Sequence, residues 1–317
     1  MNNHRIVGLD IIRGLAICIV IFVNMHEVLP IMAGSIPHFS ETDKFIDSIF
    51  KIVIDEKFIN LFTILFGIGM GIFMNNAKQK HLPPLKLMFR RLIFLFVVGL
   101  PLLLYELPFA GYAFWGMIIM FATLIKRKWI VLCLATLFIA YNLCSTFIDH
   151  SNNLNMLSLM LFGLYMSESK KIYDIRKHFK FFLITFCVAL VMLLTVFSLY
   201  QVDISNWQTT ISLAAPLQTI IYFIVLLYLT LLTPVQKLLK PFEQVGKMAF
   251  TLFILQILFI IITLKLIGIV YPTPTESLIY GFPILIILII IALLWLANFK
   301  QGPLEKVWRK WTYKNVK

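Results

Sequence analysis

Long apolar segments separated by short polar ones make up most of the chain. A helix needs about 20 apolar residues, or about 17 with favourable flanking groups, to cross a hydrocarbon core of roughly 30 Å. Ten segments qualify, some of them marginally, and the sixth is the shortest: 11–33, 58–74, 92–107, 109–125, 129–148, 154–166, 181–200, 211–232, 248–271 and 278–297. The pattern therefore predicts an all-α, polytopic membrane protein of about ten transmembrane helices.

The distribution of basic residues predicts the orientation of these helices, because Lys and Arg near the ends of spans stay in the cytoplasm. With a cytoplasmic N-terminus, 23 of the 28 Lys and Arg residues lie on the inner side and most acidic residues lie outside. Removing the span at 154–166 would move the basic loop 170–180 to the wrong side. Ten helices with both termini cytoplasmic is the arrangement that fits.

The composition agrees with this prediction. Of the 317 residues, 60% are hydrophobic and only 14% are charged, and the mean hydropathy is +0.90, whereas a soluble domain is about one quarter charged. The net charge of +13 chiefly follows the predicted topology. No loop is long enough for a soluble domain, so we predict one membrane domain over residues 1–298.

The tail 299–317 alternates basic and aromatic residues, including Trp308, Arg309, Lys310 and Trp311. Aromatic residues favour the membrane interface, and Lys and Arg favour an anionic leaflet. We predict a cytoplasmic amphipathic helix whose partner is the lipid bilayer with its anionic inner leaflet. A nucleic-acid partner is disfavoured, because the tail follows directly on a membrane helix.

The first outer loop, about residues 34–57, has apolar residues at helical spacing with charged residues around them: Phe45, Ile49, Ile52 and Val53 with Asp43, Asp47 and Lys51. This pattern is typical of an amphipathic helix on the outer surface. An extension of the second span fits equally well, and the sequence leaves both open.

Charged and polar residues within apolar spans are costly and need a partner or a function. Asp10 and Arg13 lie three residues apart at the cytoplasmic end of the first span, where an ion pair that fixes helix depth is the simpler interpretation. His26 and Glu27 lie near its outer end. They are candidates for proton transfer near neutral pH, although simple hydration at the headgroups explains them as well.

Three further polar residues fall inside spans: Asn24, Glu106 and Lys265. The side chain of Lys265 either extends to the membrane interface or pairs with Glu27 or Glu106, and the sequence leaves both open. The four cysteines show no CxxC spacing, so no metal site is expected. Gly67, Gly69 and Gly71 lie inside an apolar span, which favours a close helix contact over a nucleotide loop.

Three stretches resemble the YeiB-like bacterial membrane proteins, a family long labelled as of unknown function. These are residues 9–16 (LDIIRGLA) followed by Asn24, residues 57–67 (KFINLFTILFG), and residues 302–309 (GPLEKVWR) with Thr312 and Tyr313. Together they bracket nearly the whole chain, and the third closes it.

The resemblance implies a ten-helix fold related to transmembrane acyltransferases, a bacterial cell membrane location, and a site lined by Arg13 and the outer end of the first helix. Acyl-CoA would be the donor in such an enzyme; no other cofactor is evident. Two departures stand out. Related acyltransferases often have a histidine where this chain has Asn24, so His26 would be a displaced substitute. The stretch 99–111 also lacks the family's histidine and Gly-Asp pair and keeps only Glu106.

Because these groups are missing, the favoured hypothesis is a non-catalytic accessory protein that assists export of, or immunity to, a peptide antibiotic of the lantibiotic type, beside ABC transporter subunits. The first alternative is a transmembrane acyltransferase in which His26 is the general base, Glu27 orients it and Arg13 contacts the donor. The second is a proton-coupled transporter that uses Glu27, Glu106 and Lys265.

Overall fold

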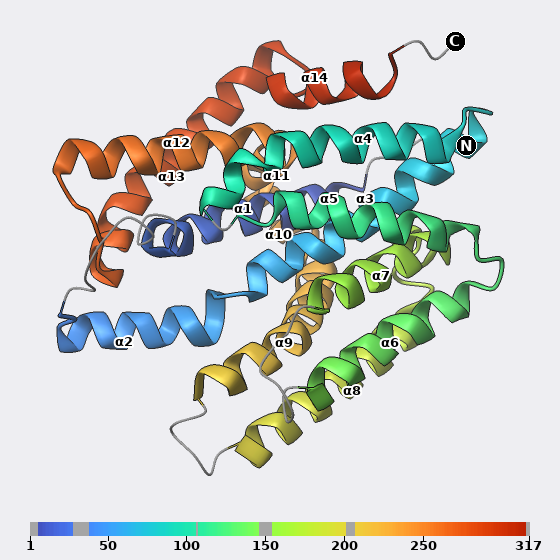
Figure 1. The fold of residues 1–317 in the computed structure, drawn as a ribbon, viewed down its shortest axis with the longest axis horizontal. Coiled ribbons are helices and arrows are strands. Elements are labelled where there is room, and N and C mark those ends of the chain that lie inside the picture. Colours follow the sequence, from blue (N-terminus) through green and yellow to red (C-terminus); the bar gives the residue numbers. More distant parts are fainter. Residues whose placement is uncertain (1–5, 28–37, 106, 146–153, 201–206, 315–317) are drawn as a thin grey trace. The chain divides into compact units, whose positions relative to one another are not determined.

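The computed structural model describes residues 6–27, 38–105, 107–145, 154–200 and 207–314, and within these ranges the regular elements are all helical. The chain divides into two compact units. Figure 1 shows the helices, coloured along the sequence. Unit 1 comprises residues 1–59, 104–107 and 226–307, and unit 2 comprises residues 60–103, 108–225 and 308–317. The predicted all-α class is confirmed for the described residues.

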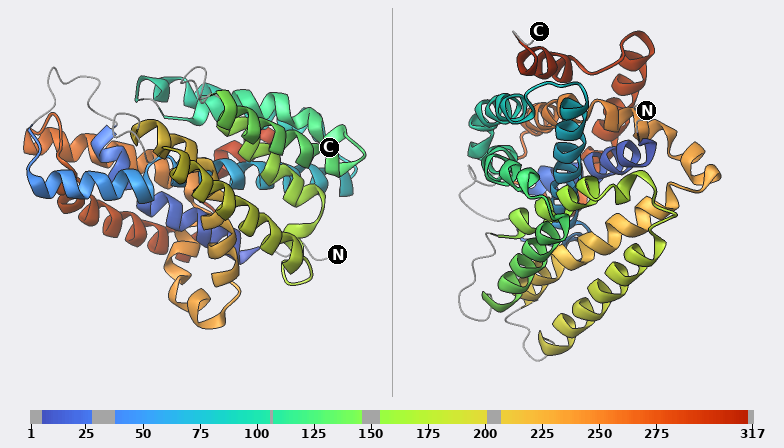
Figure 2. Two further views of the ribbon diagram at one scale, coloured as in Figure 1. Left: turned by 90° about the horizontal axis from the view of Figure 1, so that it is seen from below. Right: turned by 90° about the vertical axis from the view of Figure 1, so that its right-hand side faces the viewer.

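Unit 1 is built around α1 (Val7–Glu27), which is largely buried and packs against α11 (Lys240–Lys247), α12 (Ala249–Ile267) and α13 (Pro274–Asn298). α12 and α13 also contact each other. Figure 2 draws them in orange and red-orange. The unit further contains α2 (Glu41–Ile49), the π-helical turn η2 (Phe50–Ile54) and α10 (Thr233–Leu238). α10 and α11 are short helices in a segment that the hydropathy pattern predicts as a loop.

The contact between α1 and α11 depends on two glycines. A Cβ atom on Gly14 would overlap the carbonyl group of Phe242, and one on Gly246 would overlap the carbonyl group of Asp10. Each helix therefore presents a glycine to the backbone of the other, which lets the two backbones approach closely.

Unit 2 contains most of α3 (Lys57–Gln79), of the 3₁₀ turn η3 (Pro101–Tyr105) and of α9 (Trp207–Leu229). Its complete helices are α4 (Pro84–Gly99), α5 (Phe109–Ile119), α6 (Lys128–Ser145), α7 (Asn155–Glu168) and α8 (Phe179–Tyr200). It also contains the 3₁₀ turns η4 (Met120–Leu124) and η5 (Lys171–Tyr173). α4 pairs with α5, and α6 pairs with α7. The last helix, α14 (Pro303–Thr312), runs from unit 1 into unit 2.

The glycines of α3 make the close helix contact that the sequence predicts. A Cβ atom on Gly67 would overlap the backbone of Met160 in α7, and one on Gly163 in α7 would overlap the backbone of Ile64 in α3. Gly71 meets the side chain of Ser167, whereas Gly69 faces open space. The interpretation as a helix contact rather than a nucleotide loop is confirmed for Gly67 and Gly71.

Six segments of the described chain are long and apolar enough to cross a membrane: Val7–His26, Glu41–Gln79, Phe179–Leu199, Thr210–Leu229, Ala249–Ile267 and Pro274–Asn298. Shorter apolar helices cover Phe109–Leu124 and Lys128–Cys144. The protein is thus a helical membrane protein, and the count of ten spans stays a prediction. The sixth predicted span is the short helix α7, whose residues are almost all buried.

The third predicted span differs most from the structure. It was expected at 92–107, but α4 begins at Pro84 and ends at Gly99. Pro84 occupies the first turn, where its missing N–H costs nothing. Leu100 keeps helical backbone angles, but Pro101 has no N–H group to donate to the preceding turn. The α-helix therefore ends, and the chain continues as a 3₁₀ turn.

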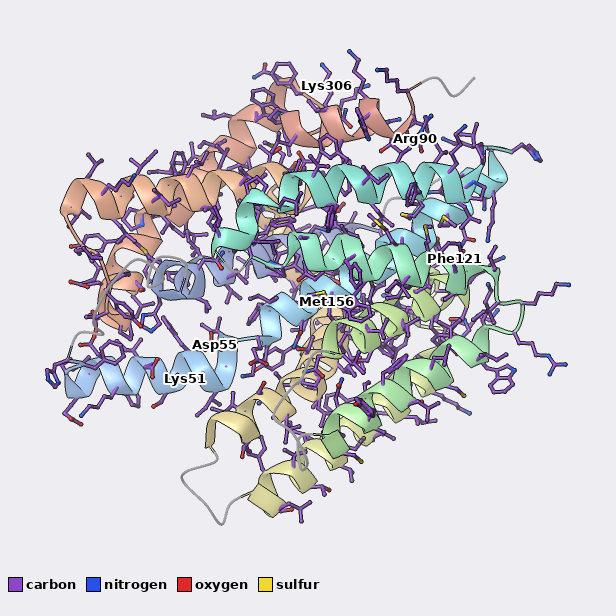
Figure 3. The ribbon with its side chains drawn as sticks, in the orientation of Figure 1. Lys51, Asp55, Arg90, Phe121, Met156 and Lys306 are labelled. Carbon is purple, nitrogen blue, oxygen red and sulfur yellow. The ribbon has the colours of Figure 1, made fainter. Side chains whose placement is uncertain are left out.

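α2 is a helix of its own, separated from α3 by a turn at Asp55 and Glu56, where Glu56 has a φ of 58°. Figure 3 labels Lys51 and Asp55 on this connection. Of the two interpretations that the sequence left open, the separate amphipathic helix is the one found.

Candidate functional site

His26 lies in the last turn of α1, at the end predicted to be outside. Its Nδ1 atom is 3.1 Å from the carbonyl oxygen of Pro272, which lies in the connection between α12 and α13. Because a carbonyl oxygen can only accept a hydrogen bond, Nδ1 carries the proton and donates it. The neutral imidazole therefore has its basic lone pair on Nε2.

Asp47 of α2 supplies the group that faces this Nε2 atom. Its Oδ1 atom is 3.8 Å from His26 Nε2, and its Oδ2 atom accepts from Lys51 Nζ at 2.7 Å. The first distance is too long for a hydrogen bond. The two side chains are nevertheless close enough for an electrostatic contact. The side chains of His26 and Asp47 are only 14% and 15% exposed, so water screens the pair incompletely.

The side of α2 that carries Asp43 and Asp47 faces the other helices of unit 1, which is why Asp47 reaches His26. The helix begins with a capping box between Ser40 and Asp43. The second oxygen of Asp43 accepts from the hydroxyl group of Thr275, at 2.5 Å, and from its backbone N–H, in the first turn of α13. This contact attaches α2 to α13.

The other side of α2 and η2 is apolar and exposed, with Phe45, Ile49, Ile52 and Val53 between 38% and 67% accessible. This arrangement is the reverse of a helix on a soluble protein, whose apolar stripe faces the core. It suits a helix in contact with lipid, and it leaves Asp43 and Asp47 facing inward.

Two aromatic rings border His26. The ring of Tyr271 meets it edge-on with centroids 5.6 Å apart, and the ring of Phe39 lies 5.8 Å away. The imidazole is thus held by a carbonyl group, a carboxylate and two rings from three parts of unit 1.

The remaining residues predicted near this site lie elsewhere or outside the described residues. Glu106 and the side chain of Glu27 are not among those described. Lys265 lies on the exposed face in the last turn of α12. Asp47 and Pro272 are the residues that the structure places at His26, and the predicted role of Glu27 stays a prediction. The amphipathic pattern of residues 43–53 includes Asp47, but the pattern does not indicate that Asp47 contacts His26.

Asn24 is buried, and its partner is Gln256 of α12. In the amide orientation that satisfies its neighbours, the Gln256 oxygen accepts from Asn24 Nδ2 at 3.0 Å and from Ile21 N at 3.2 Å, while its nitrogen donates to Ile17 O at 3.2 Å. Ile17 O and Ile21 N are the two groups that an α-helical hydrogen bond joins. Gln256 therefore binds the backbone of α1 itself, and the structure gives Asn24 a structural partner.

Asp10 and Arg13 form the predicted ion pair, with 2.9 Å between Arg13 Nη1 and Asp10 Oδ1. Arg13 Nη1 also donates to the carbonyl oxygen of Gly246 at 3.4 Å, near the C-terminus of α11. Thirteen residues of helix separate Arg13 from His26, which is about 20 Å. The two side chains therefore do not act on the same reacting atom.

The closing motif has structural roles that sequence analysis did not predict. The Glu305 carboxylate accepts from the backbone N–H groups of Phe250 and Thr251 at 2.8 and 3.2 Å, and so caps the N-terminus of α12. In unit 2, Trp308 Nε1 donates to the carbonyl oxygen of Arg91 at 2.9 Å, and the Arg91 guanidinium group lies 3.9 Å over the Trp308 ring.

Among the three sequence motifs, the family match covers the third, at residues 302–313. The family described as "Protein of unknown function (DUF418)" matches residues 167–315. The chain is 25% identical to the uncharacterized protein YxaH of Bacillus subtilis (strain 168), over 99% of this chain and 95% of that protein. It is 26% identical to an uncharacterized 39.9 kDa protein in the amylase 3' region of Bacillus acidopullulyticus, over 98% of this chain and 94% of that one.

No solved structure matches this chain. The relatives are described as uncharacterized, so the site geometry has to carry any argument about chemistry. The resemblance to the YeiB-like membrane proteins is confirmed, since residues 167–315 match DUF418, which is that family.

Proposed function

We propose that this protein is a ten-helix transferase of the bacterial cell membrane that moves an acyl group to a hydroxyl acceptor on the extracytoplasmic side. The observation that supports the proposal is the geometry of His26. Nδ1 donates to Pro272 O, which leaves Nε2 basic, and Nε2 faces Asp47. A general base needs a fixed tautomer and a group that stabilises its protonated form.

In this reaction Nε2 of His26 removes the proton of the acceptor hydroxyl group. The oxygen attacks the carbonyl carbon of the acyl donor, the C–O bond forms, and the bond to the leaving thiolate breaks. The imidazolium then returns its proton to the thiolate. With acyl-CoA as donor substrate, Arg13 would contact only a remote part of it, because it lies about 20 Å along α1.

A proton-coupled transporter is the second candidate. Asp47 joins His26 to Lys51 through its two oxygens, and such a chain of titratable groups can take up and release a proton. The accessory role in peptide-antibiotic export or immunity has no comparable observation in its favour and stays a prediction.

The test uses membranes from cells that produce the full chain, incubated with acetyl-CoA labelled in the acetyl group. His26→Asn is expected to lower transfer of label to extracytoplasmic material by about 10²-fold or more, because the general base is lost. Asp47→Asn should lower it less, since Nε2 remains. Glu41→Gln is the matched control, because Glu41 is an exposed acid on the same helix whose partner is Lys44.

Transfer that is absent from the wild type, or unchanged in His26→Asn, would refute acyl transfer. A membrane-potential or pH-gradient change that depends on His26 in reconstituted vesicles would then support the transporter.

A further inference from the structure

A basic and aromatic surface on unit 2 remains outside the proposed chemistry. It is formed by Arg309, Lys310, Trp311 and Lys314 at the C-terminal end of α14, and all four side chains are exposed. We refer to these four residues as the α14 patch. Three cations and an exposed tryptophan within six residues are typical of a surface that meets an anion beside an apolar phase.

The opposite side of α14 is fixed to unit 2, so the patch cannot turn inward. The ring of Trp308 stacks on Arg91, which also lies 5.0 Å from the ring of Phe73. Arg90 Nη1 donates to the carbonyl oxygen of Lys314 at 2.5 Å. Thr312 is buried and donates to Trp308 O. Figure 3 labels Arg90 on α4.

The charges of the patch are not neutralised within the part of the chain that the structure describes. The ion pairs of the described residues do not involve Arg309, Lys310 or Lys314. In unit 2 the carboxylate of Glu168 binds Lys128, and Asp174 accepts from the backbone of Lys177. These exposed cations are therefore open to an anion from outside the chain.

The surroundings favour a lipid as the source of this anion. α4, which holds α14, exposes apolar side chains along its length, including Phe89 at 44% and Val97 at 58%. Trp311 is itself 46% exposed, and its ring lies 6.3 Å from that of Phe94 of α4. Cations beside exposed apolar residues mark the boundary between headgroups and hydrocarbon.

We propose that the α14 patch is a binding site for the phosphate headgroups of anionic lipids, with Arg309, Lys310 and Lys314 as the phosphate contacts and Trp311 at the acyl-chain boundary. The inference is independent of acyl transfer. It goes beyond a general attraction to the inner leaflet, because it assigns lipid selectivity to three named side chains.

Native mass spectrometry of the full chain in detergent tests this, with equal amounts of phosphatidylglycerol and phosphatidylcholine added. The wild type is expected to retain phosphatidylglycerol preferentially. Each cation near an anionic surface contributes roughly fivefold in affinity. In the triple variant Arg309→Gln, Lys310→Gln, Lys314→Gln, the preference for phosphatidylglycerol over phosphatidylcholine should therefore fall by at least about tenfold.

The matched control removes three other exposed cations of unit 2, Lys78→Gln, Lys80→Gln and Lys126→Gln, and should keep the preference. A second variant, Arg309→Lys with Lys310→Arg, changes the same positions but keeps their charge, and it should also keep the preference for phosphatidylglycerol. This variant separates lost binding from lost folding. An equal loss in the control, or an unchanged triple variant, would overturn the site. Tighter patch-dependent binding of a short single-stranded DNA probe would assign the patch to nucleic acid instead.

Discussion

Glu305 and Gln256 show how single polar residues act in this apolar chain. Glu305 lies on α14 but binds the first N–H groups of α12, and Gln256 lies on α12 but binds the backbone of α1. Free N–H groups at a helix start are costly when they are buried without a partner. Both residues therefore stabilise a helix other than their own, and both are structural.

Replacement of Glu305 by Ala is expected to destabilise the protein by about 1–2 kcal/mol, the usual cost of a lost N-terminal cap. Thermal unfolding in detergent measures the change. Lys306→Ala, at the exposed neighbouring position, should stay within about 0.5 kcal/mol of the wild type. Equal stability of Glu305→Ala and the wild type would show that water caps α12 adequately.

At the scale of helices, close glycine contacts set which elements pair. α1 meets α11 through Gly14 and Gly246, and α3 meets α7 through Gly67 and Gly163. In lipid, helices gain little from burying apolar side chains, so close backbone approach supplies much of the attraction. The sequence shows glycines in the spans, but only the contacts show which of them matter.

Gly67 and Gly69 give a direct test because they lie two residues apart in α3. Gly67→Ala places a methyl group into the backbone of Met160 and should cost about 1–3 kcal/mol. Gly69→Ala faces open space and should be neutral or stabilising by up to about 1 kcal/mol, because alanine favours helix. Denaturant unfolding in mixed micelles would compare the two, and equal effects would argue against the α3–α7 contact.

At the scale of the whole molecule, hydropathy predicts ten spans, and the described structure contains six helical segments that are long and apolar enough to cross a membrane. The difference falls on short helices such as α7, which has 14 residues, or about 21 Å. Because its residues are almost all buried, α7 can cross only in the company of other helices.

Cysteine accessibility in intact cells tests the topology. In a chain whose four native cysteines are replaced by serine, Lys44→Cys should react with a membrane-impermeant maleimide from outside. Lys126→Cys and Lys177→Cys should react only after permeabilisation. Residues 126 and 177 lie on the same side if α6 and α7 both cross the membrane between them. Outside labelling at Lys177→Cys alone would mean that α7 does not span.

The candidate site was predictable only in part. His26 was identified from its type and position near a span end, and Asp10 and Arg13 were correctly paired because three residues bring side chains together on one helix face. The partners Asp47 and Pro272 come from segments about 20 and 246 residues away. No local spacing rule links such segments, so the pairing of His26 could not be read from the sequence.

The sequence by itself determined that this is an all-helical membrane protein, because the free energy of placing apolar and charged groups in lipid depends on residue type along short segments. It also determined that residues 43–53 form an amphipathic pattern. Only the tertiary structure decided that the acidic side of α2 faces inward to His26, that Gly67 rather than Gly69 meets α7, and that Glu305 caps α12. These depend on contacts between distant segments, which are fixed by the packing of whole helices.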